Sequence, residues 1–177
     1  MTGGNFPAGA GVLILLSGYP GAGKTTFART LATRLACVHI ESDEVRRRVT
    51  GQPQYTRQEH SRTFALAEAL VAEALAAGRD VVFDGTNLTH RDRRRFLQLG
   101  ARQGAAVVPV RLTAPDATIR ERLAGARQGY SQATIAVFES MAGRAQPFFI
   151  PVVVVDTRFD TASAVALVAE MVSGQRC

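Results

Sequence analysis

The feature that most constrains this chain is a glycine-rich segment, Gly18 to Thr25, with the sequence GYPGAGKT. It matches the phosphate-binding pattern GxxxxGK[ST] at every fixed position. A continuous apolar run from Val12 to Leu16, ending in Ser17, precedes the segment, and a helix-like run over 25–36 follows it. Because a buried strand, a glycine loop and a helix in this order are the context that the pattern requires, we expect a strand–loop–helix unit that binds phosphate.

The residue types in this loop suit a nucleotide. Glycines let the backbone turn its N–H groups inward to form an anion nest, and the first turn of the following helix adds unpaired N–H donors and a positive dipole end. Lys24 can reach the β and γ phosphates, and the Thr25 hydroxyl can hold Mg²⁺, a cation that prefers oxygen ligands. We therefore expect ATP and Mg²⁺ as cofactors, the alternative being a glycine turn without a ligand. The expected ATP-binding residues are Gly18, Tyr19, Pro20, Gly21, Ala22, Gly23, Lys24, Thr25 and Thr26.

Composition sets the general class of the chain. Its 177 residues, 46% of them apolar, are enough for one domain with a real core. The net charge of +6 favours contact with polyanions, although nucleotide binding alone can account for a basic chain. The two cysteines, Cys37 and Cys177, show neither metal spacing nor a disulfide framework. Without a basic leader region or an apolar run long enough to span a bilayer, we expect a soluble, cytoplasmic protein with no membrane partner.

Strand-like and helix-like segments alternate along the whole chain. The expected strands are 12–17, 38–40, 81–84, 106–112 and 152–155, the last apolar on both faces. The expected helices are 25–36, 44–49, a long one that Thr56 opens with a capping box to Glu59, 91–102 after a Thr89 cap, 115–124, a stretch from a Ser131 cap to about 145, and 161–172 after an Asp160 cap. Short apolar strands that alternate with helices predict a parallel sheet covered on both faces.

Chemically active side chains follow three of these strands. They are Ser17 before the glycine loop, the pair Ser42 and Asp43, and the run Asp84 to Asn87. Because loops at the carboxyl ends of parallel strands build the site of an α/β protein, we expect these residues to lie together.

In four places the chain resembles the small P-loop kinases of the adenylate-kinase-like group, within it the polynucleotide 5′-hydroxyl kinases and their zeta-toxin-like AAA-33 relatives. The matching segments are 17–26, 40–46, 81–88 with Arg93 and Arg94, and 119–123 with Arg127 beyond it. The resemblance implies an α/β, three-layer P-loop NTPase fold with a five-stranded parallel sheet in the order 2-3-1-4-5 and a short helical lid. The glycine-rich start predicts a flexible leader over 1–10, and the absence of a repeat or long linker predicts a single P-loop kinase domain over 11–177.

The residues that follow the strands have expected roles, of which the base role of Asp43 is also the one that the resemblance implies. Asp43 is expected to be the general base that accepts the hydroxyl proton, with a helix N-cap as the alternative. Arg46, one helical turn on, would bind a phosphate of the acceptor. Asp84 would hold Mg²⁺ through water or orient Arg46, with a turn-forming role as its alternative. Thr86 and Asn87 are weaker candidates for acceptor contact.

Arginines complete the expected site. Arg122 and Arg127 flank a glycine-bounded segment that looks like a lid and would bring charge to the transferring phosphoryl group; alternatively Arg120 and Arg122 only solvate a helix. The cluster Arg91 to Arg95 lies where a helix begins, a place unfavourable for cations, so it is either a phosphate-binding group or a solvated face. His39, His60 and His90 show no partner spacing, and we expect none of them to be catalytic.

The favoured function is an ATP-dependent kinase that transfers the γ-phosphoryl group to a hydroxyl, above all the 5′-hydroxyl of a polynucleotide. The alternatives are a small-molecule kinase for a nucleoside, sugar or antibiotic, and a nucleotide-binding module without catalysis. A base at Asp43 argues against the module, since a switch needs no proton acceptor on the acceptor side.

Overall fold

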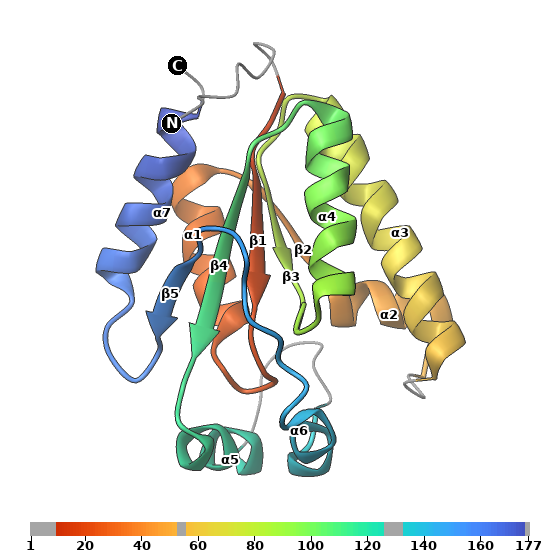
Figure 1. The fold of residues 1–177 in the computed structure, drawn as a ribbon, viewed down its shortest axis with the longest axis vertical. Helices are drawn as coiled ribbons and strands as arrows, with labels where there is room; N and C mark the ends of the chain where they lie inside the picture. The colour runs from red at the N-terminus through yellow and green to blue at the C-terminus, as the bar shows by residue number, and fades with distance from the viewer. Residues whose placement is uncertain (1–9, 53–55, 126–132, 176–177) are drawn as a thin grey trace.

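The structure is a computed structural model that describes residues 10–52, 56–125 and 133–175. Strands and helices alternate as the sequence pattern predicts (Figure 1). The strands are β1 (Leu13–Ser17), β2 (Val38–Glu41), β3 (Val81–Asp84), β4 (Val107–Thr113) and β5 (Val153–Asp156). The helices are α1 (Lys24–Leu35), α2 (Ser42–Thr50), α3 (Arg57–Ala76), α4 (His90–Gln103), α5 (Asp116–Ala124), α6 (Ile135–Met141) and α7 (Ala162–Gly174).

The five strands form one parallel sheet in the order β2-β3-β1-β4-β5, which confirms the expected topology. Since all strands run in the same direction, their carboxyl ends share one edge. Pro109 fits inside β4 because the pairing with β5 begins only at Val110. At the other side of the sheet, Glu41 of β2 lies in register with Asp84 of β3.

Helices cover the sheet on both faces, α1 and α7 on one and α3 and α4 on the other (Figure 1). The alternation of side chains along β1 divides the core accordingly. Ile14 and Leu16 belong to the cluster packed under α1 and α7, and Leu13 and Leu15 to the cluster packed under α3 and α4. The last strand is apolar on both faces as expected, but β5 lies at the edge of the sheet and is only partly covered, since Val154 is 61% exposed.

The helix caps are partly as predicted. Thr56 and Thr89 accept the backbone N–H groups of Glu59 and Asp92, each at 3.2 Å. The helix expected from Ser131 to about 145 is shorter: Thr134 caps α6, which ends at Met141, and Ser131 lies outside the described residues. The N-cap of α7 is Thr161 rather than Asp160, whose carboxylate accepts the N–H of Ala162 at 3.0 Å.

The helices α5 and α6 lie beyond the carboxyl edge of the sheet, outside the two sheet-covering layers (Figure 1). They share a small apolar cluster of their own, formed by Ile119, Leu123 and Phe138. The ring of Tyr19, in the glycine loop, packs edge-on against Phe138 with 5.5 Å between ring centroids. This pair of helices therefore rests directly on the loop. Among the described residues, no helix is long and apolar enough to cross a membrane.

Candidate functional site

The glycine loop joins β1 to α1 in a geometry that leaves the start of the helix open. Gly21 and Gly23 have φ values of 80° and 85°, the left-handed region that favours glycine. A Cβ atom on Gly23 would lie 3.3 Å from Thr157, so the loop also has little room there for a larger residue. No side chain caps α1, which begins at Lys24. Its first N–H groups can therefore serve an anion such as phosphate.

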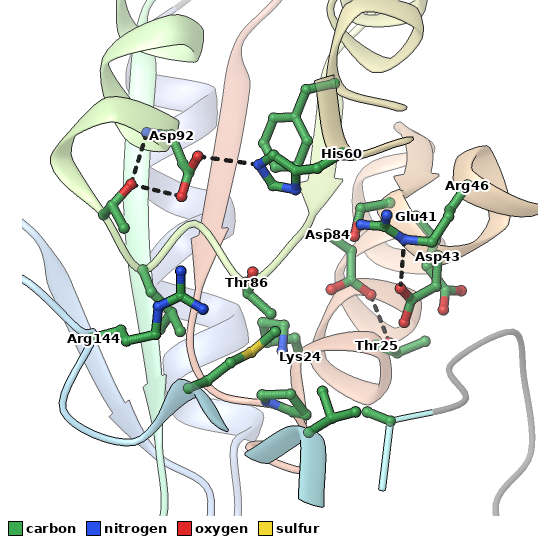
Figure 2. Close-up of a pocket in the computed structure, with 18 of the residues that line it drawn as sticks. Lys24, Thr25, Glu41, Asp43, Arg46, His60, Asp84, Thr86, Asp92 and Arg144 are labelled. Atoms are coloured by element: carbon green, nitrogen blue, oxygen red, sulfur yellow. Dashed lines mark hydrogen bonds and ion pairs between the residues drawn. The ribbon is translucent and has the colours of Figure 1, made fainter. Parts of the chain in front are cut away.

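Two loop side chains are placed for nucleotide chemistry. The Lys24 ammonium donates to the Tyr19 carbonyl at 2.9 Å and lines the cavity. The Thr25 hydroxyl donates at 2.6 Å to Oδ2 of Asp84, the last residue of β3 (Figure 2). A hydroxyl and a buried carboxylate at this distance are oxygen donors of the kind that Mg²⁺ prefers, so both residues fit the expected metal role.

A buried cluster that the sequence analysis missed surrounds Asp84. The His39 Nε2 atom lies 3.5 Å from Asp84 Oδ2, and ligand atoms of His39, Glu41 and Asp84 lie within 4.8 Å of one another. Burial, followed by the charges of Asp84 and Asp43, raises the pKa of Glu41 to about 7. The signal in the sequence was the spacing of His39 and Glu41, which places both on the same face of β2.

Asp43 lines the cavity from the first turn of α2. Its alternative role as a helix cap is wrong, because Glu41 is the N-cap residue of α2 and no side chain accepts a capping hydrogen bond there. Arg46 is 7% exposed and donates to Glu59 Oε1 at 2.9 Å, with its Nε 4.0 Å from Asp43 Oδ1 (Figure 2). The carboxylates beside Arg46 are thus Glu59 and Asp43, whereas Asp84 is bonded to Thr25.

The two weaker acceptor candidates lie in different surroundings. Thr86 lines the cavity. Asn87 is fully buried, has a φ of 41°, and donates to the Leu16 carbonyl at 2.6 Å. The Ser17 hydroxyl in turn donates to the Asn87 carbonyl at 3.0 Å. Asn87 therefore holds the β3–α4 turn against β1 and is not placed to touch an acceptor.

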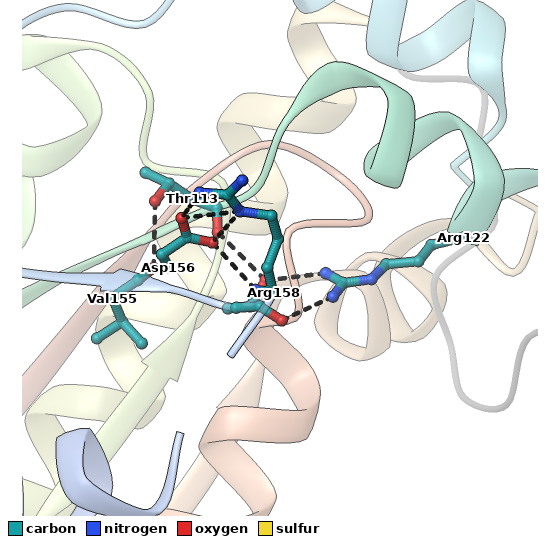
Figure 3. A network of polar contacts seen from close by, with 6 residues as sticks. Thr113, Arg122, Val155, Asp156 and Arg158 are labelled. Atoms are coloured by element: carbon teal, nitrogen blue, oxygen red, sulfur yellow. Dashed lines mark hydrogen bonds and ion pairs between the residues drawn. The ribbon is translucent and has the colours of Figure 1, made fainter. Parts of the chain in front are cut away.

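Arg122 connects the glycine loop to the turn after β5 (Figure 3). Its guanidinium donates to the Thr157 hydroxyl and carbonyl, both at 2.8 Å, and to the Gly21 carbonyl at 3.3 Å. Arg120 instead pairs with Glu139 of α6 at 2.5 Å. The second expected lid arginine, Arg127, lies outside the described residues.

The far end of the cavity is a wall formed by the first turns of α3 and α4, which we call the α3–α4 wall. Its lining residues are Arg57, His60, Ser61 and Phe64 of α3, and Arg91, Asp92 and Arg95 of α4. His60 Nε2 lies 3.5 Å from Asp92 Oδ1, and this contact ties the two helix starts together (Figure 2). Burial opposes ionisation of Asp92, but hydrogen bonds from His60 and Thr89 outweigh it and hold the pKa of Asp92 below its usual range.

The arginine cluster of α4 divides into different roles. Arg93 is 3% exposed and donates to backbone carbonyls, which makes it a structural residue. Arg91 and Arg95 line the cavity, whereas Arg94 is exposed and lies outside its lining. All three histidines have partners: His39 and His60 contact aspartates, and His90 Nδ1 lies 3.1 Å from Arg93 and stacks on Phe149.

One cavity of about 910 Å³ unites these parts. Its lining includes residues of the glycine loop, Asp43 and Arg46 of α2, and the α3–α4 wall. Arg144, which follows α6, also reaches it (Figure 2). The sequence analysis missed Glu59, the α3–α4 wall other than its α4 arginines, and Arg144.

The parallel sheet and the glycine loop define the class of this protein: it has the fold of P-loop kinases. The family AAA_33, described as an AAA domain, matches residues 13–148, and the chain belongs to that family. The chain is 30% identical over 144 residues to an uncharacterized protein of Mycobacterium tuberculosis, and the match covers 75% of this chain. The chain spans only 29% of the length of that relative.

Solved structures with known folds agree with this class. A kinase candidate from Chloroflexus aurantiacus has a TM-score of 0.73 and 22% identity, with 94% of this chain and 98% of that chain covered. A gluconokinase from Sinorhizobium meliloti has a TM-score of 0.65 and 18% identity, with 96% of this chain and 99% of the gluconokinase chain covered. The APS kinase of Mycobacterium tuberculosis, solved with AMPPNP and APS, has a TM-score of 0.70 and 12% identity over 93% and 98%. At these identities the likeness concerns the fold.

Proposed function

We propose that this protein is an ATP-dependent kinase that transfers the γ-phosphoryl group of ATP to a hydroxyl compound. The observation that carries this proposal is the shared cavity, which Asp43 lines together with the phosphate-binding loop and the polar α3–α4 wall. A module that only binds a nucleotide needs no second compartment and no carboxylate beside it. The cavity thus favours transfer over a purely regulatory role.

In the proposed reaction the acceptor oxygen attacks the γ phosphorus, its bond to the β-phosphate oxygen breaks, and ADP leaves. Asp43 accepts the hydroxyl proton and orients the oxygen. Lys24 exchanges the Tyr19 carbonyl for the β and γ phosphates, and the first N–H groups of α1 bind the phosphate oxygens. Mg²⁺, held by Thr25 and Asp84, would neutralise charge on those oxygens. Arg122, already bonded to Gly21, keeps a cation beside the loop.

The acceptor class is the open part of this function. The 5′-hydroxyl of a polynucleotide rests on the resemblance, together with the expectation that Arg46 binds an acceptor phosphate. In this protein Arg46 is buried and paired with Glu59, so it offers the polynucleotide little support. A smaller hydroxyl compound, such as a sugar or nucleoside, would fit a cavity of about 910 Å³ that also holds the phosphates of ATP.

The test is Asp43→Asn in a kinase assay with labelled ATP and a panel of 5′-hydroxyl oligonucleotides, nucleosides, sugars and aminoglycosides. We expect turnover to fall about 10²–10⁴-fold, the usual range for a lost general base. ATP affinity and unfolding should change little, because Asp43 does not cap α2. The matched control is Glu44→Gln, next in sequence and paired with Arg48 outside this cavity. Turnover of the Asp43 variant within threefold of the wild type would refute its role as the base.

A further inference from the structure

Three arginines that line the cavity have no role in the proposed transfer reaction. Arg57, Arg91 and Arg144 form no side-chain hydrogen bond or ion pair in the described part of the chain. The other arginines of the cavity have partners there: Arg46 pairs with Glu59, Arg95 with Glu68, and Arg122 with Thr157 and Gly21. Arg57, Arg91 and Arg144 are exposed residues, and they bring three positive charges to the lining of one cavity.

The positions of two of them are electrostatically unfavourable without a ligand. Arg57 is the first residue of α3 and Arg91 the second residue of α4, where a cation opposes the helix dipole. Neither arginine caps its helix, because Thr56 and Thr89 provide the caps. An anion at this place would interact favourably with both guanidinium groups and with both helix starts.

The surrounding geometry brings these charges to the same compartment. The contact of His60 with Asp92 ties the first turn of α3 to the first turn of α4. Arg57, His60 and Phe64 are spaced three and four residues apart, so they share one face of α3. The ring of His60 packs on Phe64 with 4.3 Å between centroids and a tilt of 38°, so this part of the cavity lining is partly apolar. From another element, the Arg144 side chain points into the cavity (Figure 2).

We propose that the hydroxyl compound that accepts the phosphoryl group also carries an anionic group, which Arg57, Arg91 and Arg144 bind. The group is a phosphate, a sulfate or a carboxylate, since guanidinium binds all three through paired hydrogen bonds. This inference rests on the proposed function for the identity of the ligand as an acceptor. The alternative, that Arg57 and Arg91 serve ATP, is less consistent with the fold, because α3 and α4 cover the face of the sheet opposite to α1.

A binding measurement tests the anion site without any turnover. The protein is saturated with AMPPNP and Mg²⁺, which occupies the glycine loop, and its Tm is then followed against sodium sulfate and against sodium chloride of equal ionic strength. We expect sulfate to raise the Tm of the wild type above the chloride value, and Arg57→Ala or Arg91→Ala to lose most of this difference. The control is Arg94→Ala, an exposed arginine of α4 outside the cavity, which should behave as the wild type. An equal sulfate effect in all four proteins would overturn the proposal.

A kinetic measurement then tests the acceptor. Matched pairs are compared with saturating ATP: gluconate with glucose, a nucleoside 3′-phosphate with its nucleoside, and, as a separate arm, a 5′-hydroxyl oligonucleotide. We expect a strong preference for the anionic member of a pair. Arg91→Ala should raise its KM about 10–100-fold, the loss expected for charged hydrogen bonds, while kcat and the KM for ATP stay within about twofold.

The outcomes separate the two proposals. Equal use of charged and neutral acceptors, or a rise in the KM for ATP in Arg91→Ala, would overturn the anionic acceptor and leave the kinase intact. Phosphorylation of the oligonucleotide alone would assign the bound phosphate to a polynucleotide and overturn the smaller acceptor. If no compound is phosphorylated, the kinase proposal fails, and the sulfate measurement still decides whether the arginines form an anion site.

Discussion

Replacement of Arg93 should destabilise this protein strongly, although the sequence places Arg93 in an arginine-rich helix start that could be a solvated face. Arg93 is 3% exposed, and its guanidinium lies 4.1 Å from the centre of the Phe148 ring. Its four hydrogen-bond acceptors are the carbonyls of Asn87 at 3.2 Å, Leu88 at 2.8 Å, Gln146 at 3.1 Å and Pro147 at 2.7 Å. The side chain thus fastens the turn after β3 and the segment before β5 to α4.

The expected loss follows from these four bonds. A hydrogen bond to a charged group contributes about 1.5–3 kcal/mol. In Arg93→Ala the buried carbonyls of Asn87 and Leu88 each lose the guanidinium but keep a second donor, the Ser17 hydroxyl and the Gln146 N–H. The carbonyls of Gln146 and Pro147 are partly accessible and can turn to water. Because the two buried bonds are lost without replacement by water, we expect a decrease of about 3–5 kcal/mol in the free energy of unfolding.

The assay is equilibrium unfolding in urea, followed by circular dichroism, on wild type, Arg93→Ala and Arg93→Lys. The lysine variant should lie between the other two, because an ammonium group donates fewer hydrogen bonds and cannot reach four carbonyls at once. Arg94→Ala on the same helix is the control and should change stability by less than about 0.5 kcal/mol. A loss below about 1 kcal/mol in Arg93→Ala would refute this account of the four bonds.

Three further predictions concern the site and the core. Lys24→Ala should keep the fold, since the Lys24 ammonium donates to the Tyr19 carbonyl within the same short loop, and should lose phosphoryl transfer; near-normal turnover in a folded variant would exclude the loop from catalysis. Because the pKa of Glu41 is raised from 4.5 to about 7, the native state keeps a proton that the unfolded chain has released, so stability should fall as pH rises through this interval. At 1.36 kcal/mol per pH unit, the free energy of unfolding should fall by at most about 3 kcal/mol. The measurement is urea unfolding in EDTA at pH 5 and pH 8, and Glu41→Gln should abolish the fall. If the wild type shows no fall, burial does not raise the pKa of Glu41 as argued. Burial raises the pKa of the Cys37 thiol to about 11, so in a Cys177→Ser background iodoacetamide at pH 8 should label native Cys37 about 100-fold more slowly than Cys37 in urea, and equal rates would contradict the prediction.

The sequence predicted those parts of the fold that depend on neighbours along the chain. Apolar periodicity located the strands, and the caps at Thr56 and Thr89 involve partners only three residues away. The strand order, in contrast, came from the resemblance to P-loop kinases rather than from any local pattern. Local patterns also could not show that β5 lies at an edge, since a run of valines reads the same in an edge strand as in a central strand.

The partners of the site residues were beyond local reasoning because they are remote in sequence. Glu59 pairs with Arg46 from a different helix and was noticed only as a capping residue. His60 meets Asp92 only because α3 and α4 pack side by side, a contact that no spacing in the sequence reveals. The loop residues were different: GxxxxGK[ST] carries its own geometry, so Lys24 and Thr25 could be assigned roles before the fold was known.

The separate apolar cluster of α5 and α6 has a consequence for local unfolding of the protein. Stability is distributed unevenly in folded chains, and a unit that rests on few buried side chains can exchange with an open form while the rest stays native. The burial of Ile119, Leu123 and Phe138 stabilises this unit by about 1.5–3 kcal/mol per side chain. Each of the two core clusters that cover the sheet buries many more side chains. Since Tyr19 packs on Phe138, we expect each such opening to loosen the glycine loop as well. The dissociation rate of a bound nucleotide should then follow this local opening rather than the global stability of the sheet.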